Sequence, residues 1–184
     1  MSSTGTLPAN EVRSMFDRIA PVYDVMNRVM TAGLDVRWRR ITAGSVVRPG
    51  DRILDACCGT GDLAVAASRA GGKVTGLDFA PRMLERARRK LPTATWVEGD
   101  LLALPFEEGS FEVATVGFGV RNVADLQGGL AELCRVLVPN GRGTAVRSRE
   151  GTCRRTRPST ACRAAGRSGR TRRDRRARGG RAAA

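Results

Sequence analysis

One short segment constrains the fold of this chain more than any other: two glycines between a strand-like run and a helix-like run. Residues 52–57 (RILDAC) have the composition of a buried strand, and residues 62–70 have the periodicity of a helix. Between them, Gly59 and Gly61 let the backbone turn sharply and approach a ligand without hindrance from side chains. Because the amides at the start of the helix point toward the same turn, the sequence predicts a ligand-binding loop here.

Strands and helices are expected to alternate along much of the chain. Further strands are predicted at residues 73–78, 95–98 and 111–117, and further helices at 82–91 and 124–137. Residues 11–48 have helical periodicity, which Pro21 is expected to interrupt, and residues 139–141 are expected to stop the last helix. Alternation of this kind indicates parallel βαβ units. The predicted fold class is therefore α/β, Rossmann-like, with a mostly parallel sheet.

The net charge of +14 is concentrated in the last part of the chain. Residues 142–184 hold 15 arginines and only two acids, whereas residues 1–141 hold 17 basic and 16 acidic residues. The tail also lacks Leu, Ile, Phe, Met, Trp and Tyr, so we expect it to be disordered. It could be a basic arm that binds nucleic acid or lipid, or the product of a shifted reading frame in a GC-rich gene. We favour the shifted frame and do not expect a nucleic-acid partner.

Three regions follow from this composition. They are a helical cap (residues 1–48), an α/β core (residues 49–141) and a non-native tail (residues 142–184). The chain contains no histidine, and its five cysteines lack paired spacing, so no metal site is expected. An odd number of cysteines and the absence of a signal-like or membrane-spanning segment predict a cytoplasmic protein. The basic and aromatic residues at 36–40 suggest peripheral membrane contact, with a solvated basic patch as the alternative. The oligomeric state is left open.

Acidic residues lie at or near the carboxyl ends of three successive predicted strands, where α/β sheets bind their ligands. Asp55 is placed to face a cationic group such as the ammonium of S-adenosylmethionine (SAM), Asp78 to accept from ribose hydroxyls, and Asp100 to accept from the adenine amine. Residues 101–106 are expected to close over the adenine, and Gly117 to form the pocket floor. A nicotinamide dinucleotide is the rival ligand, because residues 59–64 also satisfy a loose G-x-G-x-x-A pattern. We favour SAM, because Asp55 would face a pyrophosphate unfavourably. A glycine turn in an unrelated α/β domain is the third alternative.

Several longer motifs carry a family resemblance. Residues 16–27 read F-D-R-I-A-P-x-Y-D-x-M-N, residues 118–122 read F-G-x-R-N, and residues 135–141 read R-V-L-x-P-x-G. Over residues 11–142 the chain resembles the ubiquinone/menaquinone biosynthesis C-methyltransferase family, which implies SAM-dependent C-methylation of a prenylated, lipid-like quinol. The resemblance also implies a class I methyltransferase fold whose C-terminal strands are missing here. It adds Thr60 and Leu101 to the expected SAM contacts, together with Phe79 beside Asp78.

Five residues are expected to face the substrate: Tyr23, Asp24, Asn27, Arg121 and Asn122. In the implied reaction, a proton leaves the ring hydroxyl and the neighbouring carbon attacks the sulfonium methyl group. Without histidine, the base must be a carboxylate, Tyr23 or an activated water, and Arg121 could steady the phenolate. Tyr23 could instead pack the helix, Asp24 or Asn27 could cap it, and Arg121 could pair with a carboxylate.

Four other functions stay open at this point. They are methylation of another small molecule, a dehydrogenase, a nucleic-acid binder acting through the tail, and an inert fragment with exposed sheet edges.

Overall fold

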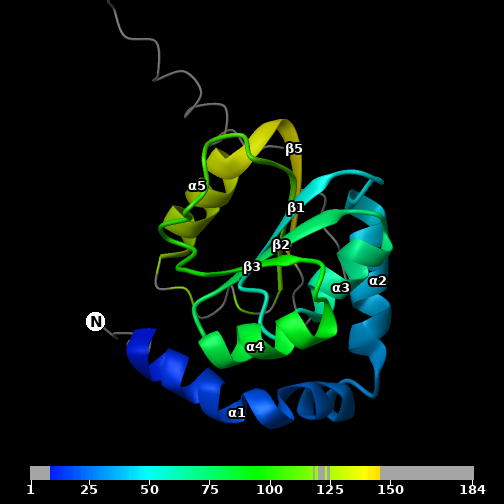
Figure 1. Cartoon of the computed structure of the whole chain (residues 1–184), viewed down its shortest axis with the longest axis vertical. Coiled ribbons are helices and arrows are strands. Elements are labelled where there is room, and N and C mark those ends of the chain that lie inside the picture. Colours follow the sequence, from blue (N-terminus) through cyan, green and yellow to red (C-terminus); the bar gives the residue numbers. More distant parts are fainter. Residues whose placement is uncertain (1–8, 118, 120–122, 124, 146–184) are drawn as a thin grey trace, which may run out of the picture.

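The computed structural model describes residues 9–117, 119, 123 and 125–145 (Figure 1). The described elements, in chain order, are α1 (Ala9–Met30), α2 (Leu34–Val46), β1 (Arg52–Ala56), α3 (Asp62–Arg69), β2 (Lys73–Asp78), α4 (Pro81–Lys90), β3 (Thr95–Glu98), β4 (Phe111–Val116), α5 (Leu126–Val136) and β5 (Leu137–Ala145). The strands at 73–78 and 95–98 have the bounds that the sequence predicts, and the other predicted elements between residues 52 and 137 are present with small shifts at their ends. The predicted βαβ alternation is confirmed.

The strands form one sheet in the order β3-β2-β1-β4-β5, and each described pairing is parallel. Both faces of this sheet are covered, which is the usual arrangement for parallel strands. Leu54 packs in a core cluster with residues of α5, whereas its neighbour Ile53 packs with residues of α2 and α3. Figure 1 shows α5 and the α2–α3 pair on opposite sides of the sheet. The α/β Rossmann-like fold is therefore confirmed.

The last strand differs from the expectation. Residues 139–141, which were expected to stop the last helix, lie inside β5, where Leu137 pairs with Phe111 and Arg142 pairs with Val113. The intervening residues bulge out, with Asn140 at a φ of 65°. The strand then continues to Ala145, beyond the predicted core boundary at residue 141. The Arg142 side chain donates to the carbonyl of Val46 (2.7 Å) and pairs with Asp51 (2.6 Å), which anchors this part of the strand.

The expected interruption of the first helix at Pro21 is wrong, because α1 runs through it. Proline has no amide hydrogen, so the helix loses one backbone hydrogen bond at that point. Packing on both sides of Pro21 compensates for that loss. Phe16, Ile19, Ala20 and Tyr23 cluster with Ala80 and Met83 at the start of α4. The helix α1 therefore lies along α4, while α2 packs mainly on α3 (Figure 1).

Candidate cofactor-binding site

The candidate site lies at the carboxyl ends of β1, β2 and β3. We call residues 57–61, which join β1 to α3, the glycine loop. The amide of Gly59 donates to Asp78 Oδ2 over 2.7 Å, which ties the loop to the end of β2. Gly61 has a φ of 79°, and a Cβ there would lie 2.7 Å from the Trp96 ring, so only glycine fits. The predicted loop therefore exists and brings the ends of two strands together.

Asp55 lies at the sheet centre, beneath the glycine loop, and is fully buried. The Thr115 hydroxyl donates to its Oδ1 over 2.7 Å, whereas Oδ2 has no hydrogen-bond partner within the described part of the chain. Burial raises the pKa of Asp55 to about 7, although the hydrogen bond from Thr115 lowers it. A buried carboxylate oxygen without a partner is suited to a cationic donor, so this acceptor fits the ammonium of SAM.

Asp78 ends β2 and is held by backbone amides. Its Oδ1 accepts from the amide of Ala80 over 2.9 Å, while Oδ2 accepts from Gly59. Burial raises the pKa of Asp78, and these amide hydrogen bonds oppose the rise. A carboxylate has about four acceptor positions, so the two amides leave capacity for a sugar hydroxyl. Beside it, the ring of Phe79 meets that of Phe16 on α1 edge to face, with centroids 6.2 Å apart.

The segment after β3 begins with Asp100, which is exposed and accepts from the amide of Leu102 over 2.9 Å. Leu101 is 3% exposed and packs in the core cluster with Leu54 and Leu133. Its side chain therefore anchors the turn to the core.

A pair of residues on α5 holds this segment, and sequence reasoning missed both. Glu132 accepts from the amide of Leu104 over 2.9 Å. Arg135 donates to the carbonyls of Phe106 (2.8 Å) and Leu104 (3.0 Å) and also pairs with Glu132 (2.7 Å). We call Glu132 and Arg135 the α5 clamp. Their i, i+3 spacing is visible in the sequence, but their backbone partners about 30 residues away are not.

A polar network connects α1 to the glycine loop. Asp24 pairs with Lys90 of α4 (2.7 Å) and accepts from the hydroxyl of Thr60 (2.5 Å). Lys90 also donates to Thr60 Oγ1 (3.0 Å) and pairs with Asp62 (2.5 Å). Burial raises the pKa of Asp24, but the hydrogen bonds from Lys90 and Thr60 outweigh it and leave the pKa below its ordinary value. Lys90 was not among the predicted site residues, because nothing in its local sequence marks it.

The other described residues that were expected to face the substrate make fewer polar contacts than Asp24. Tyr23 packs against Phe16 with ring centroids 6.3 Å apart, as the packing alternative expected. The side-chain nitrogen of Asn27 is buried and has no hydrogen-bond partner among the described residues. Gly117 directly follows β4, and a Cβ there would meet nothing within 4 Å. Arg121 and Asn122 lie outside the described residues.

The structure thus brings together Asp55, Gly59, Thr60, Gly61, Asp78 and Phe79, with Asp24 joining them from α1. Two further observations bear on other possible functions. Cys57, the first residue of the glycine loop, is a poor nucleophile, because burial raises its pKa to about 12. Over the described part of the chain, no helix is long and apolar enough to cross a membrane, and no group of three or more His, Cys, Asp or Glu side chains could hold a metal ion.

Known structures place this architecture in a class. A TehB-like SAM-dependent methyltransferase from Corynebacterium glutamicum superimposes with a TM-score of 0.60 and 28% identity, over 68% of this chain and 71% of that one. The [4+2]-cyclase SpnF shares the fold at a TM-score of 0.67 and 19% identity, over 78% of this chain and 61% of that one. The fold is that of the class I SAM-dependent methyltransferases, as the sequence predicted.

The ubiE/COQ5 methyltransferase family matches residues 5–157, and the chain belongs to this family. It is 47% identical to the demethylmenaquinone methyltransferase of Thermus thermophilus over 135 residues, which is 70% of this chain and 61% of the relative. It is 43% identical to the 2-phytyl-1,4-naphtoquinone methyltransferase of Trichormus variabilis over 143 residues, 72% of this chain and 62% of the relative. The chain therefore spans about three fifths of the length of these relatives, and the predicted family is confirmed.

Proposed function

We propose that this chain provides the SAM-binding part of a methyltransferase that C-methylates a prenylated naphthoquinol on the route to menaquinone. The observation that carries the proposal is the meeting of the glycine loop with Asp55 and Asp78 at the carboxyl ends of adjacent strands. The substrate class is supported by the two relatives described above, whose names both refer to naphthoquinones.

The proposed cofactor contacts follow the geometry of this edge. The glycine loop and Asp55 would hold the amino-acid end of SAM, with Thr60 at the start of α3. Asp78 would accept from the ribose hydroxyls, flanked by Phe79. Asp100, Leu101 and the clamped segment behind them would border the adenine, and Gly117 would lie below. When bound, SAM supplies a methyl group on a positively charged sulfur.

The chain's own residues would orient the quinol and move one proton. Loss of the ring hydroxyl proton would make the neighbouring carbon nucleophilic toward the methyl group that bound SAM supplies. Loss of the hydrogen from that carbon, with return of a proton to the ring oxygen, would then restore the aromatic quinol. Alignment and exclusion of water are the main contributions of such a site. Asp24 pairs with Lys90 and accepts from Thr60, which supports a role in anchoring α1 to the glycine loop. Tyr23, Asn27, Arg121 and Asn122 remain the proposed substrate-facing residues.

Methyl transfer from labelled SAM to a short-chain demethylmenaquinol tests the proposal, with SAM binding measured separately by calorimetry. We expect both binding and transfer. Replacing Arg121 with Ala should reduce transfer far more than SAM binding, and an equal loss of both would overturn its catalytic assignment. Binding of SAM without transfer to any quinol would point to another small-molecule substrate. Binding of NAD in place of SAM would refute the proposal.

The proposed location is the cytoplasm, with peripheral contact at the inner face of the membrane. A prenylated quinol resides in the bilayer, so the enzyme must meet it at a lipid surface. The basic and aromatic stretch at 36–40 contributes exposed Val36, Arg37 and Arg40, whereas Trp38 is partly buried against the protein. The stretch therefore offers charge at the surface rather than an exposed aromatic anchor.

A further inference from the structure

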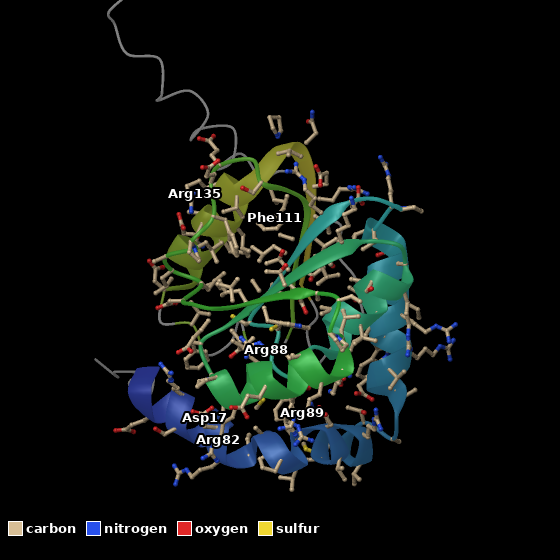
Figure 2. The ribbon with its side chains drawn as sticks, in the orientation of Figure 1. Asp17, Arg82, Arg88, Arg89, Phe111 and Arg135 are labelled. Carbon is tan, nitrogen blue, oxygen red and sulfur yellow. The ribbon has the colours of Figure 1, made fainter. Side chains whose placement is uncertain are left out.

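A groove of about 370 Å³ runs between α1 and α4, outside the cofactor site. Three arginines of α4 reach it from successive turns, at the i, i+4 and i+7 spacing that places side chains on one helix face. Figure 2 shows Arg82 and Arg89 where α4 runs along α1. The groove is lined by Ala20, Pro21, Arg82, Glu85, Arg86 and Arg89.

Positive charge exceeds negative charge in this groove. Arg82 and Arg89 are exposed, and in the described ranges no carboxylate lies within ion-pair distance of either. Arg86 approaches Asp24 only at 4.0 Å, and its Nε is buried without a hydrogen-bond partner among the residues that the structure describes. Glu85 is the single acid in the lining. Such a concentration of guanidinium groups attracts anions and suits phosphate oxygens.

A second feature borders the groove: an exposed apolar stripe on α1. Val22 is 57% exposed, Val25 65% and Val29 76%, and they follow one another at helical spacings of three and four residues. Val25 also lies one turn after Pro21, which lines the groove, so groove and stripe adjoin on the helix surface. Met30, 77% exposed, extends the stripe toward α2. Contiguous exposed apolar side chains of this size mark interaction surfaces.

We propose that the groove and the stripe together form a docking surface for a bilayer of anionic phospholipid. Headgroup phosphates would bind Arg82 and Arg89, while the valines of the stripe would enter the boundary between headgroups and acyl chains. A second copy packed symmetrically on this face would bring another set of unpaired arginines to it, which charge opposes. The inference rests on the proposed function only in that a lipid substrate gives the docking a purpose.

Vesicle partitioning of the full chain tests this surface without SAM or quinol. The probes are phosphatidylcholine vesicles with and without about 30% phosphatidylglycerol, a fraction typical of an anionic surface. The variant R82Q/R89Q should bind the anionic vesicles about thirtyfold more weakly than the parent chain. The matched control, R48Q/R69Q, removes two exposed arginines elsewhere and should lose less than threefold. Both variants keep the basic tail, so its contribution cancels.

The stripe is tested with V25S/V29S, whose sites are exposed enough to leave folding intact, as thermal unfolding would verify. We expect it to weaken partitioning at high salt, where charge attraction is screened and apolar insertion remains. The proposal would be overturned if R82Q/R89Q and R48Q/R69Q lost vesicle binding equally. It would also be overturned if V25S/V29S bound vesicles as well as the parent chain at high salt, or if millimolar inorganic phosphate displaced the chain from the vesicles. A dimer, seen by sedimentation, that V25S/V29S dissociates would overturn it too. Because R82Q/R89Q should still bind SAM and methylate a water-soluble quinol without vesicles, failure of docking is distinguishable from failure of the proposed function.

Discussion

The central sheet and the helix α1 are held in place by different kinds of contact. The strands are fixed by ladders and by fully buried side chains such as Ile53, Leu54 and Val113. The helix α1 contributes only a few apolar contacts, centred on Ala20, and depends on the polar network through Asp24. Much of its outer face is exposed apolar surface. The sheet is therefore stabilised mainly by burial, and α1 by a small number of specific contacts.

This difference matters because the two regions meet at the glycine loop. Asp78 fixes the loop from the side of the sheet, and Asp24 contacts it at Thr60 from the side of α1. Movement of α1 should therefore disturb the cofactor site without unfolding the sheet. Local opening of weakly held elements with a stable core is common in proteins.

The largest expected effect is on the sheet. Replacing Leu54, which is 0% exposed, with Ala should lower the free energy of unfolding by about 4 kcal/mol, because it removes buried methyl groups and leaves a cavity. Urea denaturation followed by circular dichroism measures the change. The exposed Val29→Ala on α1 is the control and should change stability by less than about 0.5 kcal/mol. If the two substitutions changed the free energy of unfolding by similar amounts, burial would not be what distinguishes the sheet from α1.

The second prediction concerns Asp55 and pH. Because burial raises its pKa from 3.8 to about 7, the folded chain holds a proton there that the unfolded chain has already released. This contribution to stability is complete below pH 4 and is lost as the pH rises toward 7, a decline of about 4 kcal/mol at about 1.4 kcal/mol per pKa unit. Unfolding in urea across this range measures it. Asp55→Asn should flatten the decline, whereas the exposed Asp100→Asn should not. Saturating SAM should reduce it if the ammonium pairs with Asp55.

A smaller and more local effect is expected for Asp24→Asn. It removes the charge that Lys90 and Thr60 bind, which should weaken the attachment of α1 by about 2 kcal/mol. Hydrogen exchange should accelerate in α1 while β1 keeps its protection. Because the folded pKa of Asp24 lies below its ordinary value, this contribution is present above about pH 4 and is lost as the pH falls through the folded pKa. Equal acceleration in both elements would show that α1 and the sheet open as one unit.

The smallest expected effect is on the α5 clamp. Arg135→Met should lower SAM affinity about fivefold, because two hydrogen bonds to the segment after Asp100 are lost while the aliphatic part of the side chain is kept. Calorimetric titration with SAM measures it. Arg135→Lys keeps the charge but not the paired donors, so its SAM affinity should lie between that of Arg135→Met and that of the parent chain. An unchanged SAM affinity in Arg135→Met would show that the α5 clamp does not support cofactor binding.

Much of the candidate cofactor site could be predicted from local sequence. The glycine loop, Asp55 and Asp78 each stand directly after or within a strand whose composition is distinctive, and parallel strands bring their carboxyl ends to one edge. Lys90 and the α5 clamp could not be predicted, because their partners lie on other elements. The interruption expected at Pro21 failed for the same reason: the packing of α1 on α4 outweighs a local preference.

The sequence by itself determined the order of strands and helices between residues 52 and 136, the position of the glycine loop and the family. These depend on periodicity, on glycine conformation and on motifs, all of which act over a few neighbouring residues. Only the tertiary structure decided that Asp24 meets Thr60 and Lys90, that Arg142 anchors β5, and that arginines of α4 line a groove beside the apolar stripe of α1. Contacts between residues far apart in the chain depend on how the elements pack, and that packing is set by the burial of many side chains together.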